Sequence, residues 1–128
     1  DLFLASRING VDGNLFTKVV HSGDAIEIEY GSAGGAFVGL PCALGVQVRA
    51  EPWWQITPAG IAPYVHMTLP QAAIVQTAPS LPAGHHTVTG IMPPGYAGAT
   101  IRVQVFCVTP TATNGVFVAT DALDLVVQ

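Results

Sequence analysis

Apolar and polar side chains alternate along much of the chain, and this alternation predicts β-strands. From residue 100 to 109 every second side chain is apolar up to Cys107, and the intervening Thr100, Arg102 and Gln104 are polar. Successive side chains of a strand point to opposite faces, so this segment predicts a strand with one face in the core and one in water. Cys107 is expected to point inward.

Further segments show the same alternation or a short apolar run. The alternation places Glu27 and Glu29 on the wet face of one strand, and Gln47 and Arg49 on the wet face of another. About ten strands are predicted in this way. Their ranges are 2–8, 15–20, 25–30, 44–50, 64–69, 73–77, 85–91, 100–109, 116–120 and 122–127.

Residues that favour turns separate these segments. Asn-Gly and Asp-Gly pairs at 9–10, 12–13 and 114–115 tolerate positive φ, and clusters of proline and glycine at 82–84 and 93–95 end regular elements. Prolines recur from 52 to 110, so helical spacing of apolar residues is repeatedly broken. We predict an all-β fold in one domain, residues 1–128: an antiparallel two-sheet β-sandwich, immunoglobulin-like or jelly-roll-like, with about 8–10 short strands.

Composition excludes several classes of protein. The chain has 128 residues, 50% of them hydrophobic and 9% charged, with a net charge of −4. Only four residues are Lys or Arg, too few to neutralise a phosphate backbone, so nucleic acid is not an expected partner. No apolar run approaches the roughly 20 residues that cross a bilayer, so no membrane span is expected.

The charged residues are unevenly distributed. Arg102 is the only charged side chain between Glu51 and Asp121. Charged surfaces normally suppress association, so such a surface favours contact with another protein copy or a polar matrix. Alternatively, sparse charge is simply typical of secreted β-proteins rich in Thr and Gly.

The two cysteines, Cys42 and Cys107, lie far apart and outside any C-x-x-C pair, which gives no support to a zinc site. We expect them to form a disulfide, which would place the protein in an oxidising compartment. The alternative is a pair of buried free thiols. The chain begins Asp1-Leu2-Phe3 without a signal peptide, so we expect a mature secreted protein, located extracellularly or at the cell surface.

Residues 80–128 contain a distinctive succession of loops and strands. Its parts are Leu81-Pro82-Ala83-Gly84, Pro93-Pro94-Gly95-Tyr96-Ala97-Gly98, Ile101-Arg102-Val103-Gln104-Val105, Asn114-Gly115 and Ala122-Leu123-Asp124-Leu125-Val126-Val127. This arrangement resembles the small β-sandwich modules at the C-terminal ends of large secreted bacterial proteins. The resemblance implies a secreted sandwich without catalytic function. The chain departs from those modules in carrying Cys107 and the pair Trp53-Trp54.

No combination of residues indicates catalysis or metal binding, so we predict a protein that is not an enzyme and has no cofactor. Gly31-Ser32-Ala33-Gly34 does not match the G-x-S-x-G spacing of a nucleophile elbow. Glu27 with Glu29 and Asp121 with Asp124 are carboxylate pairs, but glycosidic chemistry needs two carboxylates that face each other across a cleft. The sequence shows no such cleft. Among the histidines, His21, His66, His85 and His86, the adjacent pair points to opposite strand faces, and Asp12-Gly13-Asn14 lacks the acidic spacing of a calcium loop.

Two features suggest partners. One candidate is the pair Trp53 and Trp54, which could stack on a sugar ring or anchor a protein contact. Tyr64 and Tyr96 are the further aromatic residues that could complete such a platform. The apolar N-terminal residues Leu2, Phe3 and Leu4 are a candidate assembly strand that pairs with a neighbouring copy; the alternative is an ordinary first strand of the chain's own sheet.

These patterns predict a non-catalytic structural subunit of a bacterial extracellular filament, appendage or cell-surface layer, self-assembling or contacting other surface proteins. The alternative is a carbohydrate-binding module that uses exposed aromatic residues to hold glycans.

Overall fold

A computed structural model of the protein describes residues 1–13, 16–49, 73–78, 80–110 and 117–128. Strands dominate these ranges, and none of the described residues is helical, which confirms the all-β prediction. The strands are β1 (Leu2–Ile8), β2 (Val11–Asp12), β3 (Thr17–Val20), β4 (Ala25–Ser32), β5 (Cys42–Arg49), β6 (Ala73–Ala78), β7 (His85–Ile91), β8 (Thr100–Val108), β9 (Phe117–Ala119) and β10 (Leu123–Val127).

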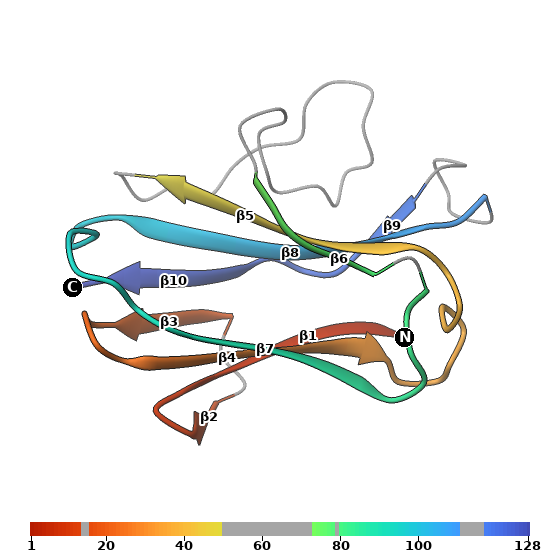
Figure 1. Ribbon diagram of the computed structural model, residues 1–128, viewed down its shortest axis with the longest axis horizontal. Coiled ribbons are helices and arrows are strands. Elements are labelled where there is room, and N and C mark those ends of the chain that lie inside the picture. The colour runs from red at the N-terminus through yellow and green to blue at the C-terminus, as the bar shows by residue number, and fades with distance from the viewer. Residues whose placement is uncertain (14–15, 50–72, 79, 111–116) are drawn as a thin grey trace.

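Two sheets lie one above the other with the core between them (Figure 1). The four-stranded sheet has the order β2-β1-β4-β7, and the six-stranded sheet has the order β3-β10-β8-β5-β6, with β9 pairing with β8. This arrangement is consistent with the predicted sandwich. The pairing is antiparallel except between β3 and β10, which run parallel. Parallel strands need a long connection, and most of the chain separates these two. The two sheets are therefore dominated by antiparallel pairing, as predicted, with one parallel pair that the prediction did not include.

Strand boundaries follow the predicted segments closely. β1 and β7 have the predicted limits, whereas β4 and β5 are longer than the alternation alone indicated. The short β2 was not predicted. It is the return arm of a hairpin whose turn residues, Asn9 and Gly10, have φ of 52° and 76°, typical of a two-residue type I′ turn. The predicted strand 64–69 and the turn 114–115 lie outside the described residues.

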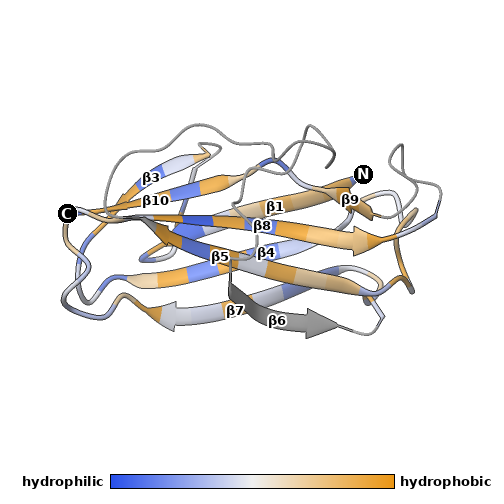
Figure 2. Ribbon diagram, turned by 90° about the horizontal axis from the view of Figure 1, so that it is seen from above, coloured by the Kyte–Doolittle hydropathy of each residue, from blue (hydrophilic) through white to orange (hydrophobic). Residues whose placement is uncertain are grey.

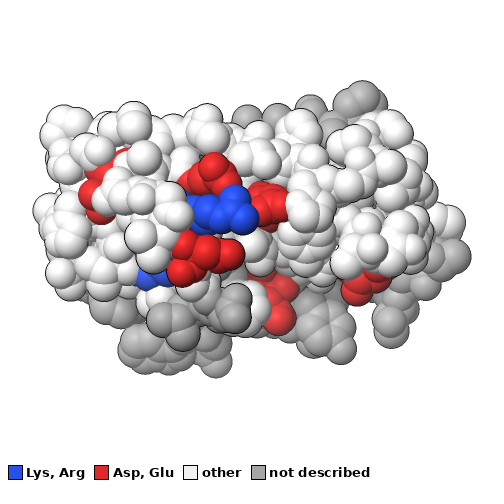
Figure 3. All heavy atoms as spheres, turned by 90° about the horizontal axis from the view of Figure 1, so that it is seen from below, with Lys and Arg blue, Asp and Glu red and all other residues white. Residues whose placement is uncertain are grey.

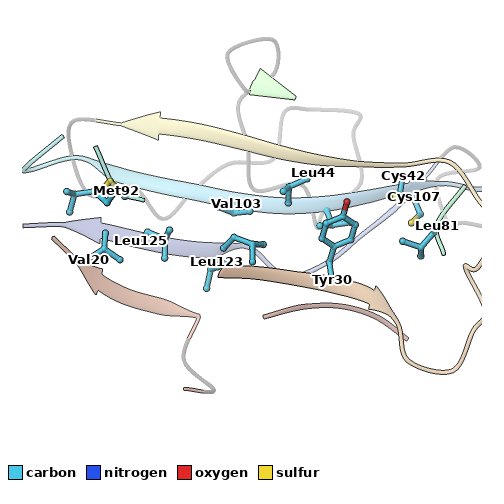
Figure 4. Packing of buried hydrophobic residues seen from close by; sticks show 13 residues of the cluster. Val20, Tyr30, Cys42, Leu44, Leu81, Met92, Val103, Cys107, Leu123 and Leu125 are labelled. Carbon is cyan, nitrogen blue, oxygen red and sulfur yellow. The ribbon is translucent and has the colours of Figure 1, made fainter. Parts of the chain in front are cut away.

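The core is built from the inward rows of both sheets (Figure 4). Val103, Val105 and Cys107 of β8 face Ile28 and Tyr30 of β4, all of them buried. Figure 2 shows apolar and polar residues interleaved along these strands, as their alternation requires. The inward orientation predicted for Cys107 is confirmed, since its side chain is fully buried.

The other face of the six-stranded sheet departs from the expectation of a wet surface. Arg102, Gln104 and Gln47 are 6%, 0% and 3% exposed. Arg102 forms two hydrogen bonds of 2.6 Å to the Asp124 carboxylate, which lies directly opposite on β10. The Gln104 amide donates to the carbonyl of Thr120 at 2.7 Å. Strand alternation gives the face of a side chain but not what packs over that face, so the prediction of exposure was wrong.

Cys42 and Cys107 are not joined by a disulfide, and both are buried. The expected disulfide is therefore not present in the structure, which has the alternative state of two buried thiols. The two residues nevertheless lie opposite each other on β5 and β8.

Candidate assembly surface

Strand β7 forms one edge of the four-stranded sheet. Its sequence, His85 to Ile91, contains no proline, lysine, arginine or carboxylate, and it pairs with β4 without a register shift. The strand begins directly after Gly84, which has φ of 87°. At Gly31 of β4 an added Cβ would lie 2.5 Å from the Gly84 carbonyl oxygen, so glycine at position 31 allows β7 to approach β4 closely.

The direction of the β7 backbone groups follows from the hydrogen bond of Met92 N to Asp24 O, 2.9 Å long. In an antiparallel pair, hydrogen-bonded and non-hydrogen-bonded residue pairs alternate. With the register of β4 and β7, the backbone groups of Val88 and Gly90 therefore point to β4. Those of Thr87, Thr89 and Ile91 point away from it. No other described strand pairs with this edge.

An apolar groove lies beside this edge, between the two sheets. It encloses about 300 Å³ and is lined from both sheets, with Ile26 and Val88 on one side and Val46 and Val48 on the other. An engineered cavity of about 150 Å³ holds a benzene-sized molecule, so this groove has room for about two apolar side chains of that size. The sheets are therefore incompletely filled at this end.

The rim of the groove exposes large apolar side chains. Ile91 is 65% exposed, Val48 49% and Tyr96 40%. Val48 was predicted to face inward, and it does line the groove, but it is not covered. Large apolar residues that border an open groove mark a contact site more often than scattered single residues do.

Charged side chains lie away from the groove. None of its described lining residues is Lys, Arg, Asp or Glu. On the outer face of the four-stranded sheet, Arg7 pairs with Glu27 and Glu29, and Glu29 also contacts His85. Figure 3 shows charged side chains gathered near the middle of this face, with mostly uncharged surface around them. A second copy approaching β7 would thus meet charges that are already paired.

On the opposite side of this sheet, β1 holds the predicted assembly residues Leu2, Phe3 and Leu4, and the two-residue β2 pairs with the end of β1 to form the edge. β1 pairs with β4 along its whole length, so in the structure it is an ordinary first strand, the alternative interpretation. Lys18 donates its amine to the carbonyl of Ser6, and β2 covers the end of β1. Lysine and added strands are common means of protecting a sheet edge, so β1 is less open to a partner than β7.

The aromatic candidates are only partly described. Trp53, Trp54 and Tyr64 lie outside the described residues. Tyr96 is described and lines the groove, where its ring adds to the apolar rim. The structure therefore connects one of these four residues with the candidate surface.

Within the described ranges, no cluster of three or more His, Cys, Asp or Glu side chains could hold a metal ion. His85 and His86 point to opposite faces as predicted: His85 contacts Phe3 and Glu29, while the ring of His86 lies 5.2 Å from that of Tyr30.

Burial, followed by the influence of Cys42, raises the pKa of the Cys107 thiol to about 12. A thiol with this pKa is not a nucleophile at neutral pH.

Sequence reasoning predicted β7 but not its role as an open edge. The signal was the absence of proline and charge from a seven-residue strand. That signal became meaningful only once the strand order placed β7 at a sheet edge.

Known proteins give no further guidance to the function. No family model matches the chain. No curated protein and no solved structure matches it significantly. The resemblance of residues 80–128 to secreted modules stays a prediction. Among the described residues, the structure contains no helix that is long and apolar enough to span a membrane.

Proposed function

We propose that this protein is a secreted, non-catalytic structural subunit that assembles with further copies of itself, in an extracellular filament, appendage or surface layer of a bacterium. The observation that carries the proposal is the edge of β7, with which no other described strand pairs, beside an apolar groove whose rim is exposed. An exposed edge strand offers unpaired N–H and C=O groups to another chain, and the groove offers apolar surface to bury.

The proposed contact is addition of a strand to the sheet. Thr87, Thr89 and Ile91 would form the new backbone hydrogen bonds, because their backbone groups point away from β4. Side chains of the added strand that face the six-stranded sheet would cover the groove. Strand addition of this kind takes affinity from the backbone and specificity from the pockets for alternate side chains.

A second copy of this chain is the occupant that best fits the edge. Two β7 strands related by a twofold axis would pair antiparallel, in the same way as the other neighbours in this sheet. Such a contact is self-complementary, as twofold interfaces must be, and it gives a dimer as the unit from which a filament or layer would be built through further contacts. β7 itself carries no Lys, Arg, Asp or Glu, and the neighbouring Glu27 and Glu29 are paired with Arg7, which lessens the like-charge repulsion between two copies.

Thr89→Pro tests this proposal. Proline has no N–H, but the N–H of Thr89 makes no bond to β4, so the chain should still fold. We expect the wild-type mass in light scattering to rise with concentration, and the variant to remain monomeric in the same range. Thr89→Val, which keeps the N–H, is the matched control and should associate like the wild type.

Two outcomes would contradict the proposal. One is a wild-type protein that stays monomeric across the whole concentration series. The other is a folded Thr89→Pro variant that associates as strongly as the Thr89→Val control, since the contact would then lie elsewhere.

A further inference from the structure

Cys42 and Cys107 form a directly opposed pair at one end of the core. They are register partners on β5 and β8, and the side chains of both point between the sheets, where they are 5% and 0% exposed. Figure 4 shows them close to Tyr30 and Leu81, away from Met92 at the other end of the core. Both side chains thus occupy the same face of adjacent strands.

The backbone hydrogen bonds identify the type of this pair. Val108 N donates to Pro41 O at 2.9 Å, and these two residues flank the cysteines in the same register. Because pair types alternate along an antiparallel ladder, Cys42 and Cys107 are a non-hydrogen-bonded pair. In such pairs the Cα atoms are typically about 4.5 Å apart, and the side chains approach more closely than in the other type.

That spacing suits a covalent link. Disulfides occur with Cα separations of about 4.4–6.8 Å and need Cβ atoms that point toward a common side. The cysteine pair meets both conditions through its register and its shared face. A bond between the sulfur atoms would therefore not require a change of strand pairing.

The surroundings of the pair restrict when a bond can form. The thiols are buried, so an oxidant cannot reach them in the folded protein without local opening. Burial also raises the pKa of Cys107 to about 12, which leaves almost no thiolate at neutral pH. Once the core has closed around the reduced pair, both access and thiolate are lacking.

We propose that Cys42 and Cys107 are an oxidation site, converted to an intrachain disulfide by a small-molecule disulfide during folding, before the two sheets close over them. The thiolate of one cysteine attacks a sulfur of glutathione disulfide and displaces one glutathione thiolate, giving a mixed disulfide. The second cysteine then attacks the protein sulfur of that mixed disulfide and releases the second glutathione. The protein loses two hydrogen atoms and two electrons, and the glutathione disulfide is reduced to two thiols.

The bond would link β5 to β8 and close a long loop that contains β6 and β7. Restricting a loop of this length in the unfolded chain is expected to raise the melting temperature by roughly 10 °C. It would secure the sheet that forms one wall of the groove, independently of whether copies associate through β7.

Refolding in two buffers tests the proposal. The full chain is unfolded with reductant and refolded either in a mixture of reduced and oxidised glutathione or in reductant alone. We expect the first product to be a monomeric chain lighter by two hydrogen atoms in intact mass spectrometry, with a melting temperature roughly 10 °C higher. Protein folded under reductant and then given oxidised glutathione should convert at least tenfold more slowly than the refolding chain.

Cys42→Ala and Cys107→Ala serve as controls, and each should melt at the same temperature in both buffers. The wild-type comparison needs no variant, so it holds even if a substitution prevents folding. The proposal is overturned if the wild type refolds in the glutathione mixture as the dithiol, or with bonds between chains. It is equally overturned if the native dithiol oxidises as fast as the refolding chain.

Discussion

Single polar side chains in this protein do more than the alternation of the sequence indicates. Arg102 lies on a strand face predicted to be wet, yet its side chain is 8% exposed and bound to Asp124 through two hydrogen bonds. The sequence placed both residues on strands, but it could not bring them together, because the pairing of β8 with β10 is a property of the fold. The residue pattern thus predicted on which face of the strand each side chain lies, but not which side chain it pairs with.

Asp124→Ala should destabilise the protein by about 3 kcal/mol, because it removes the carboxylate from a buried guanidinium. The cost can be measured as the change in unfolding free energy by urea titration. Glu27→Ala is the control: Glu27 pairs with Arg7 on a partly exposed face, where such a pair contributes about 1 kcal/mol or less. Equal losses of unfolding free energy in the two variants would contradict the larger contribution assigned to the buried pair.

Asp24 should contribute stability that depends on pH. Hydrogen bonds from the Asn9 amide, 2.8 Å, and the backbone N–H of His21, 2.7 Å, hold the pKa of Asp24 below its usual value. A depressed pKa in the folded state means that the stabilisation is present above about pH 4 and lost as pH falls further. Urea midpoints of the wild type and Asp24→Asn should therefore differ most near neutral pH and converge toward pH 3. A difference that grows on acidification would contradict this assignment.

At the scale of elements, alternation and turn residues predicted most strands well. β1 and β7 have the predicted limits, and the Asn9-Gly10 turn forms the expected hairpin. The return arm β2 was missed because two residues carry no periodic signal. The parallel pairing of β3 with β10 was missed because the two strands are far apart in the chain. Local sequence predicts a strand but not its neighbour in the sheet.

Neighbouring residues of β7 should respond in opposite ways to proline. Val88→Pro removes an N–H that points to β4, so we expect a loss of about 3 kcal/mol or more in unfolding free energy. Thr89→Pro removes an N–H that points to the free edge and should cost clearly less. Urea denaturation at a concentration where the protein is monomeric compares them. If Thr89→Pro were the more damaging, the assigned direction of the β7 backbone would be reversed.

At the scale of the whole molecule, the candidate surface arises from what the fold leaves uncovered. β7 is an edge of the four-stranded sheet, and the groove lined by residues of both sheets lies beside it. The sequence did predict a weakly charged protein suited to association, but it indicated Leu2 to Leu4 rather than β7. Both segments are strand segments without proline, Lys, Asp or Glu. Among the described residues, β2 and Lys18 on the Ser6 carbonyl protect the outer side of β1, whereas no strand pairs with the outer side of β7.

Amide hydrogen exchange, resolved by residue at low and high protein concentration, tests the central claim most directly. In dilute protein the N–H groups of Val88 and Gly90 should exchange slowly, and those of Thr87, Thr89 and Ile91 quickly, because only the former bond to β4. At high concentration the latter three should become protected as a second copy pairs with β7. Association without new protection at these three amides would contradict the proposed assembly.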